Sequence, residues 1–136
     1  MNLDLYSNQV TVVGMALTII VASAGLMKAY RNNKVIIVML VVTAIIAIVG
    51  VFLMAPATMT DRATKSEWFF SPIIFISSYA LLRRVYKKKY SREPTYNRTA
   101  LYDAEEGRNQ NSFDVVVHVL PLVFSIVLPI IISSMH

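Results

Sequence analysis

Long uncharged stretches alternate with short charged segments along most of the chain. Residues 5–27 and 35–60 carry no charge, and residues 115–135 contain His118 as their one ionisable group. A bilayer core about 30 Å thick is crossed by about 20 residues of helix that rise ~1.5 Å each. We therefore predict an all-α polytopic membrane protein with a single domain and spans at residues 9–30, 35–57 and 113–135. A soluble bundle is excluded because its helices would need charged outer faces.

A further span, over residues 68–86, completes the four predicted transmembrane helices and is the least apolar of them. Its uncharged part is short, but Trp68 begins an aromatic run that is typical of the membrane interface. At the other end, Arg83, Arg84 and Tyr86 are expected to extend to the lipid headgroups. The alternative is a re-entrant or interfacial third segment.

Positive charge is concentrated in two of the three connections. Eleven of the 13 Lys and Arg residues lie near the first connection or around the long one over residues 87–112. Because cytoplasmic loops are enriched in Lys and Arg, we predict that these two connections face the cytoplasm and that both termini face outwards. The residues expected to contact lipid headgroups are Arg83, Arg84, Lys87, Lys88 and Lys89, with Trp68 at the opposite interface.

Composition excludes several classes of small membrane protein. The chain has no cysteine, which excludes thiol–disulfide exchange, iron–sulfur clusters and thiolate zinc sites. Two histidines cannot supply both axial ligands of a haem within one chain, so a haem shared by a dimer is the alternative, and we expect no metal or cofactor. The net charge of +5 is explained by topology and anionic lipid, so no nucleic-acid partner is expected.

Transporters of similar size are also disfavoured. Proteins that insert in both orientations keep a balanced distribution of Lys and Arg, which this chain lacks. Small multidrug exporters need a carboxylate in the membrane centre, and the first three predicted spans contain none. No nucleotide-binding loop, dinucleotide fingerprint or zinc-protease signature is present.

Small residues recur at helical spacing on one face of the first span and, over a shorter length, of the second. Such faces let helix backbones approach closely in lipid. Only residues 31–34 separate the two spans, so we predict an antiparallel hairpin whose helices pack against each other. The alternative is that one face is reserved for another subunit. The residues concerned are Gly14, Thr18, Ala22, Gly25 and Ala29 in the first span and Thr43, Ala47 and Gly50 in the second.

The connection over residues 87–112 carries more tyrosine than a disordered linker usually does. Tyr86 directly precedes it, and Tyr90, Tyr96 and Tyr102 punctuate its charged sequence. We expect this loop to lie on a surface, either the headgroup layer or a partner protein.

The fourth span carries the one polar stripe within the predicted membrane region. Asp114, His118, Pro121, Ser125, Pro129 and Ser133 follow one another at steps of three or four residues. Ionisable residues in a span usually face protein or water, and they mark a possible site. The structural interpretation makes Ser112 the N-cap, lets the helix dipole stabilise Asp114, and gives His118 an inward hydrogen bond. The functional interpretation is a proton or cation path lined by this stripe in several protomers.

From these observations we expect a non-enzymatic subunit that packs within a larger membrane complex. Its partners would be the bilayer, with anionic headgroups on the cytoplasmic side, and other membrane subunits or copies of itself. The alternatives are a homo-oligomeric channel or transporter lined by the fourth span and, with less support, a membrane-perturbing effector. A bacterial cytoplasmic membrane fits the short loops and charge bias, and a mitochondrial inner membrane is the alternative location.

Overall fold

The computed structural model describes residues 3–26, 29–54, 66–95, 102–103 and 108–134. In this part of the chain the protein is all-α, apart from one antiparallel pair of two-residue strands in the long connection. The elements in chain order are α1 (Leu3–Leu26), η1 (Ala29–Arg31), α2 (Asn33–Met54), η3 (Ser66–Phe70), α3 (Ser71–Tyr90), β1 (Tyr102–Asp103), β2 (Arg108–Asn109) and α4 (Ser112–Ser134), where η denotes a 3₁₀ helix.

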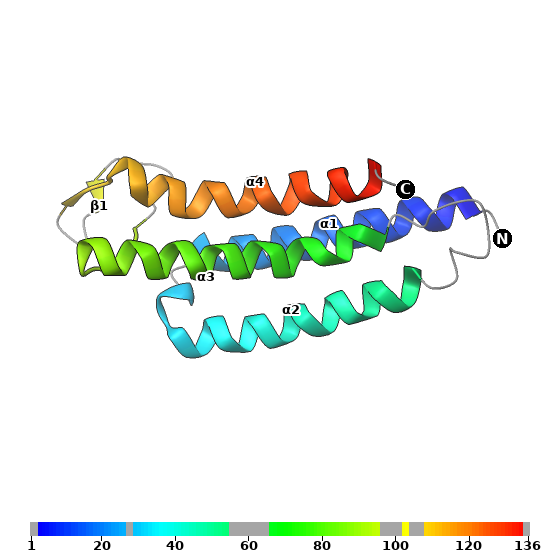
Figure 1. Ribbon diagram of the computed structural model, residues 1–136, viewed down its shortest axis with the longest axis horizontal. Coiled ribbons are helices and arrows are strands. Elements are labelled where there is room, and N and C mark those ends of the chain that lie inside the picture. Colours follow the sequence, from blue (N-terminus) through cyan, green and yellow to red (C-terminus); the bar gives the residue numbers. More distant parts are fainter. Residues whose placement is uncertain (1–2, 27–28, 55–65, 96–101, 104–107, 135–136) are drawn as a thin grey trace.

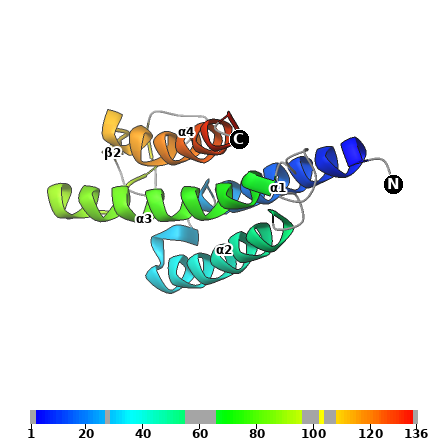
Figure 2. The same cartoon turned by 45° about the vertical axis from the view of Figure 1, so that its right-hand side comes forward.

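Helix α3 is the centre of the bundle. It contacts α1, α2 and α4, and η3 at its start contacts the same three helices. Figures 1 and 2 show α3 between α4 on one side and α2 on the other, with α1 alongside. The beginning of α1 and the end of α4 lie at the same end of the bundle, so the four helices alternate in direction (Figure 1).

The helix bounds differ from the predicted spans at α1, which begins at Leu3 and ends at Leu26 instead of covering residues 9–30, and at the end of α3. The helix continues to Tyr90, so Lys87, Lys88 and Lys89 belong to its last turn rather than to the loop. Lysine is a good helix former, and basic side chains are favoured at a helix C-terminus. Ser91 ends the helix in the left-handed conformation, with φ of 54°, and its N–H donates to the Lys87 carbonyl at 2.9 Å. The connection to α4 therefore begins at Ser91.

The predicted packing of the first two spans against each other is wrong. In the described residues α1 and α2 scarcely touch, because α3 and η3 occupy the space between them. Tyr30 in η1 turns back into the bundle, where it is completely buried. Its hydroxyl donates to the Val21 carbonyl at 2.6 Å, and its ring lies 5.4 Å from that of Tyr79 on α3. The short connection is thus anchored to α1 and α3, and the antiparallel pair it joins is spread apart.

The small residues of α1 and α2 face inwards, but these two helices pack against η3 and α3 rather than against each other. Gly14 shows this most clearly: a Cβ atom there would lie 2.7 Å from the Cβ and 2.8 Å from the carbonyl carbon of Trp68 in η3. Such distances are far inside van der Waals contact, so the backbones of α1 and η3 approach each other only because residue 14 lacks a side chain. Thr18, Thr43, Ala47 and Gly50 are buried as well, while Ala22 and Ala29 are half-buried. The surroundings of Gly25 lie outside the described residues.

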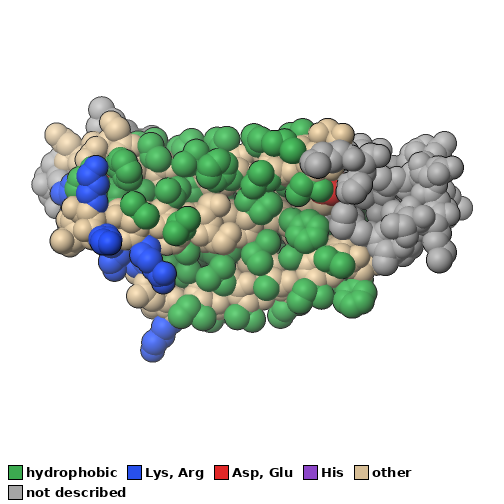
Figure 3. Space-filling model, in the orientation of Figure 1, with side chains coloured by type: hydrophobic (Ala, Val, Ile, Leu, Met, Phe, Trp, Pro, Cys, Tyr) green, Lys and Arg blue, Asp and Glu red, His purple; other side chains and the backbone are tan. Residues whose placement is uncertain are grey.

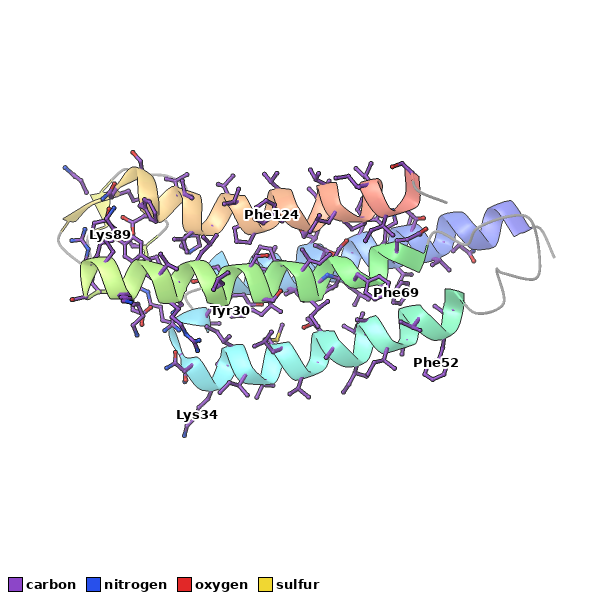
Figure 4. All side chains as sticks on the ribbon, viewed as in Figure 1. Tyr30, Lys34, Phe52, Phe69, Lys89 and Phe124 are labelled. Carbon is purple, nitrogen blue, oxygen red and sulfur yellow. The ribbon has the colours of Figure 1, made fainter. Side chains whose placement is uncertain are left out.

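Hydrophobic side chains cover much of the surface as well as forming a buried core of residues such as Val21, Ile76 and Val117. Two helices, α2 over Asn33–Leu53 and α4 over Ser112–Ile132, are long and apolar enough to cross a membrane, yet only 22% of each apolar stretch is buried. A shorter apolar stretch, Gln9–Ser23, lies in α1. Figure 3 shows hydrophobic side chains over most of the visible face, and Figure 4 shows Phe52 pointing away from α2. The core helix α3 is the most polar of the four by sequence.

Candidate functional site: the polar network at the basic end of the bundle

Arg83 is the centre of a hydrogen-bond network that joins three segments of the chain. Its Nε and Nη2 atoms donate to the two carboxylate oxygens of Glu93, each at 2.7 Å. Nη2 also donates to the Arg31 carbonyl, and Nη1 donates to Oδ1 of Asn33, both at 2.6 Å. The planar guanidinium suits this task because its donors form a rigid fork. Arg83 thereby fastens α3 to the start of α2 and to the chain that follows α3.

The expectation that Arg83 and Tyr86 extend to lipid headgroups is therefore wrong. The Arg83 side chain is 7% exposed and Tyr86 is completely buried. Arg84, Lys87, Lys88 and Lys89, in contrast, are exposed, and contact with headgroups remains a prediction for them. Trp68 is half-buried at the other end of α3.

Glu93 is the anionic partner in this network, and the sequence analysis did not single it out. Lys87 donates a third hydrogen bond to its carboxylate at 2.7 Å. Partial burial of the Glu93 carboxyl opposes its ionisation, but the hydrogen bonds from Arg83 and Lys87 outweigh burial and lower its pKa below the ordinary value of 4.5. The carboxylate is therefore charged at neutral pH.

Asp114 begins α4 in a reciprocal capping arrangement. Its Oδ2 accepts from the Asn111 N–H at 2.8 Å, while Oδ1 of Asn111 accepts from the Phe113 N–H at 3.3 Å. Asn111 is therefore the N-cap in place of the predicted Ser112, and Asp114 at N3 reaches back to its N–H as in a capping box. The second carboxylate oxygen of Asp114 accepts from the Thr95 N–H at 3.0 Å, and both Asp114 and Thr95 are buried. Asp114 therefore ties the chain after α3 to the first turn of α4.

His118 lies one turn beyond Asp114 but is bonded to its main chain. The Nδ1 atom lies 2.8 Å from the Asp114 carbonyl oxygen, and because a carbonyl can only accept, Nδ1 carries the proton. The ring meets the edge of Tyr79 on α3 at 5.4 Å between centroids. The predicted inward hydrogen bond is confirmed, and it holds the imidazole against α3.

The predicted stripe on α4 forms one face of the helix, and that face is directed at the same protomer. Asp114, Pro121, Ser125 and Pro129 are buried, and His118 is half-buried. The Ser125 hydroxyl donates to its own helix, at 2.8 Å from the Leu122 carbonyl. Helix α4 contacts α3 and η3 along this side. The surroundings of Ser133 lie outside the described residues.

Aromatic residues close the basic end where α3 meets α4. Tyr86 and Tyr90 lie 4.7 Å apart between ring centroids, and Phe113 lies 6.3 and 6.0 Å from them. The Lys89 ammonium lies 5.0 Å from the centroid of the Phe113 ring. These two tyrosines thus pack within the protein. Tyr96 lies outside the described residues, and nothing is described of the Tyr102 side chain.

Glu67 is a buried carboxyl that sequence reasoning missed. It lies in η3 and is 2% exposed, and within the described structure its Oε2 atom has no hydrogen-bond partner. The buried hydroxyl of Ser71, one turn later, has no partner there either. Glu67 lies directly before the predicted third span, so the first three predicted spans themselves still contain no carboxylate. The signal was the position of Glu67 directly before the aromatic run that starts the third helix.

Within the described ranges, no three His, Asp or Glu side chains gather in a way that could hold a metal ion. The chain matches no family model, and no curated protein or solved structure is significantly similar to it.

Proposed function

We propose that this protein is a non-enzymatic, four-span integral membrane subunit that packs within and stabilises a larger membrane protein complex. The observation that carries the proposal is the contrast between its interior and its surface. Arg83 is hydrogen-bonded to Glu93, and Asp114 accepts a hydrogen bond from the chain that follows α3. In contrast, α1, α2 and α4 turn wide apolar faces outwards. Buried polar groups that bond within the chain, together with an apolar exterior, suit a protein embedded in lipid and neighbouring helices.

The distribution of charge supports an orientation with both termini outside. Exposed Lys and Arg side chains gather at the end of the bundle formed by the α1–α2 turn and the end of α3 (Figure 3). Helices α2 and α4, of 22 and 23 residues, span roughly 33–35 Å, which matches the apolar thickness of a bilayer, while the apolar part of α1, Gln9–Ser23, is shorter. Positive charge marks the cytoplasmic end. A bacterial cytoplasmic membrane, or alternatively a mitochondrial inner membrane, is the location we propose.

The absence of cysteine provides a direct test of topology. Single substitutions Asn32→Cys, Ser91→Cys and Ser134→Cys place a thiol at exposed positions near the two ends of the bundle. With an impermeant maleimide, we expect Ser134→Cys to react in intact cells and the other two only after permeabilisation. The parent chain is the unlabelled control. Labelling in the reverse order would refute the orientation, and recovery in the soluble fraction would refute membrane insertion.

The proposed role as a subunit of a complex is tested by determining which proteins co-purify with this one. The tagged protein is extracted in a mild detergent or in native nanodiscs, and its mass and partners are determined. Stoichiometric co-purification with other membrane proteins is the expected result. A homo-oligomer free of other proteins would contradict it and would favour the second candidate.

That second candidate is a homo-oligomeric channel or transporter for protons or cations, and Glu67 is the observation in its favour. A buried carboxyl with an unpartnered oxygen is the type of group that such proteins use. The α4 stripe supports this candidate less, because the stripe faces α3 of the same protomer. Flux into liposomes is the test: Glu67→Gln should abolish it and Asp114→Asn should not. Equal flux through the parent and Glu67→Gln would exclude the role of Glu67.

A further inference from the structure

A cleft of about 380 Å³ lies between α2 and α3 at the basic end of the bundle. Its α2 wall consists of Asn33, Ile36, Ile37 and Leu40, which follow one another at steps of three, one and three residues. The wall from α3 repeats the same spacing with Ala80, Arg83, Arg84 and Lys87. Each wall is therefore a single helix face, and the volume lies in the range of small-molecule sites.

The cleft has a polar end and an apolar end. The hydrogen bond from Arg83 to Asn33 fixes these two residues at the same level of the antiparallel helices. Leu40 lies about two turns, or roughly 10 Å, deeper along α2 than Asn33. Ile37 is 61% exposed, so the apolar end opens sideways on the outer surface rather than towards the core. A ligand that fills this cleft must be polar at the basic end and apolar along its side.

The charge at the polar end is positive. Glu93 is matched by Arg83, which surrounds its carboxylate with two donors. Arg84 and Lys87 are exposed at the mouth, and Lys87 shares the same carboxylate. No hydrogen bond or ion pair of Arg84 is found among the described residues. One carboxylate and three cations leave a surplus of positive charge beside the cleft.

We propose that this cleft binds one acidic phospholipid of the cytoplasmic leaflet, with its phosphate at Arg84 and Lys87 and an acyl chain along Ile37 and Leu40. The proposal rests on the membrane insertion and orientation proposed above, which place the basic end at the headgroup layer. Basic pockets between transmembrane helices on this side of a membrane are suited to anionic headgroups. The apolar side opening explains why a lipid fits better than a soluble phosphate.

Native mass spectrometry of the full-length protein, titrated with phosphatidylglycerol or phosphatidylcholine in detergent, tests the charged end. Two cationic contacts correspond to a roughly 30-fold loss of affinity for phosphatidylglycerol in Arg84→Gln/Lys87→Gln. The matched control, Lys88→Gln/Lys89→Gln, removes the same charge from the same helix outside the cleft, so it measures general attraction to the headgroup and should lose clearly less affinity. Equal losses in both double variants, or equal affinity of the parent for both lipids, would overturn the proposal.

A second pair of variants tests the apolar end without disturbing the core. Ile37→Ser should weaken phosphatidylglycerol binding, whereas Val38→Ser, at a neighbouring position that is 59% exposed, should not. Inorganic phosphate should not displace the lipid, and displacement would show that a soluble anion is the ligand. Because these titrations are made in detergent, they fail or succeed independently of the thiol-labelling experiment, which alone tests the orientation.

Discussion

Replacing Arg83 tests whether the basic end is held together by this one side chain. Arg83→Met removes four hydrogen bonds and leaves the Glu93 carboxylate, the Arg31 carbonyl and the Asn33 amide oxygen without their donor. Removing one partner of a buried ion pair typically destabilises a protein by about 3–5 kcal/mol. The Glu93 side chain is 24% exposed and keeps its bond to Lys87, so water and lysine recover part of this loss. We expect a loss of about 3 kcal/mol, or roughly 100-fold in the unfolding equilibrium.

The adjacent residue provides the control. Arg84→Met removes the same charge from an exposed position and should change stability by less than about 1 kcal/mol. Unfolding by SDS in mixed micelles is followed by fluorescence of Trp68, the one tryptophan, whose backbone packs against Gly14 at the far end of the bundle. Arg83→Lys keeps the positive charge but lacks the planar guanidinium, so its loss of stability should lie between those of Arg83→Met and Arg84→Met. Equal destabilisation by Arg83→Met and Arg84→Met would refute the role assigned to the network.

Three further predictions follow from individual contacts, each measured by the same SDS titration. Gly14→Ala forces a Cβ against the Trp68 backbone and should cost about 1–3 kcal/mol. Asp114→Ala removes two hydrogen bonds to a buried carboxylate and should lower the free energy of unfolding by about 3 kcal/mol. Ser112→Ala should leave stability nearly unchanged, whereas it would be destabilising if Ser112 were the N-cap. The Glu93 pKa is lowered in the folded protein, so its contribution is complete above pH 4.5 and is lost as the pH falls through the folded pKa. The stability difference between the parent and Glu93→Gln should therefore shrink below pH 4.5, and a constant difference would contradict the ion pair.

The helices and the inward face of α4 could be predicted from sequence because both depend on local patterns. Uncharged runs of sufficient length locate α2 and α4 within three residues, whereas α1 begins six residues before its predicted start. The spacing of Asp114, Pro121, Ser125 and Pro129 places them on one face of any α-helix, whatever that face contacts. The small residues of α1 and α2 were likewise recognised as packing positions.

The partner of each face could not be predicted, because it depends on residues far along the chain. A short connection suggested that α1 and α2 pair, but the space between them is filled by a segment that begins more than ten residues after α2 ends. A cation near a helix end has the same sequence signature whether it extends to lipid or bonds within the protein. Arg83 does the latter because Asn33, 50 positions earlier, and Glu93, ten positions later, converge on it.

The central place of α3 has a consequence for how the protein is made. A nascent helix is transferred from the translocon into lipid according to its own hydrophobicity, and α3 combines a short apolar part with the cationic residues of its last two turns. The helices that shield its polar groups are α1 and α2, synthesised before it, and α4, synthesised after it. We therefore expect α3 to insert poorly as an isolated segment and efficiently when the first two helices are already in the membrane. The helices of this bundle would then insert in a fixed order, with α1 and α2 already in the membrane when α3 packs against them.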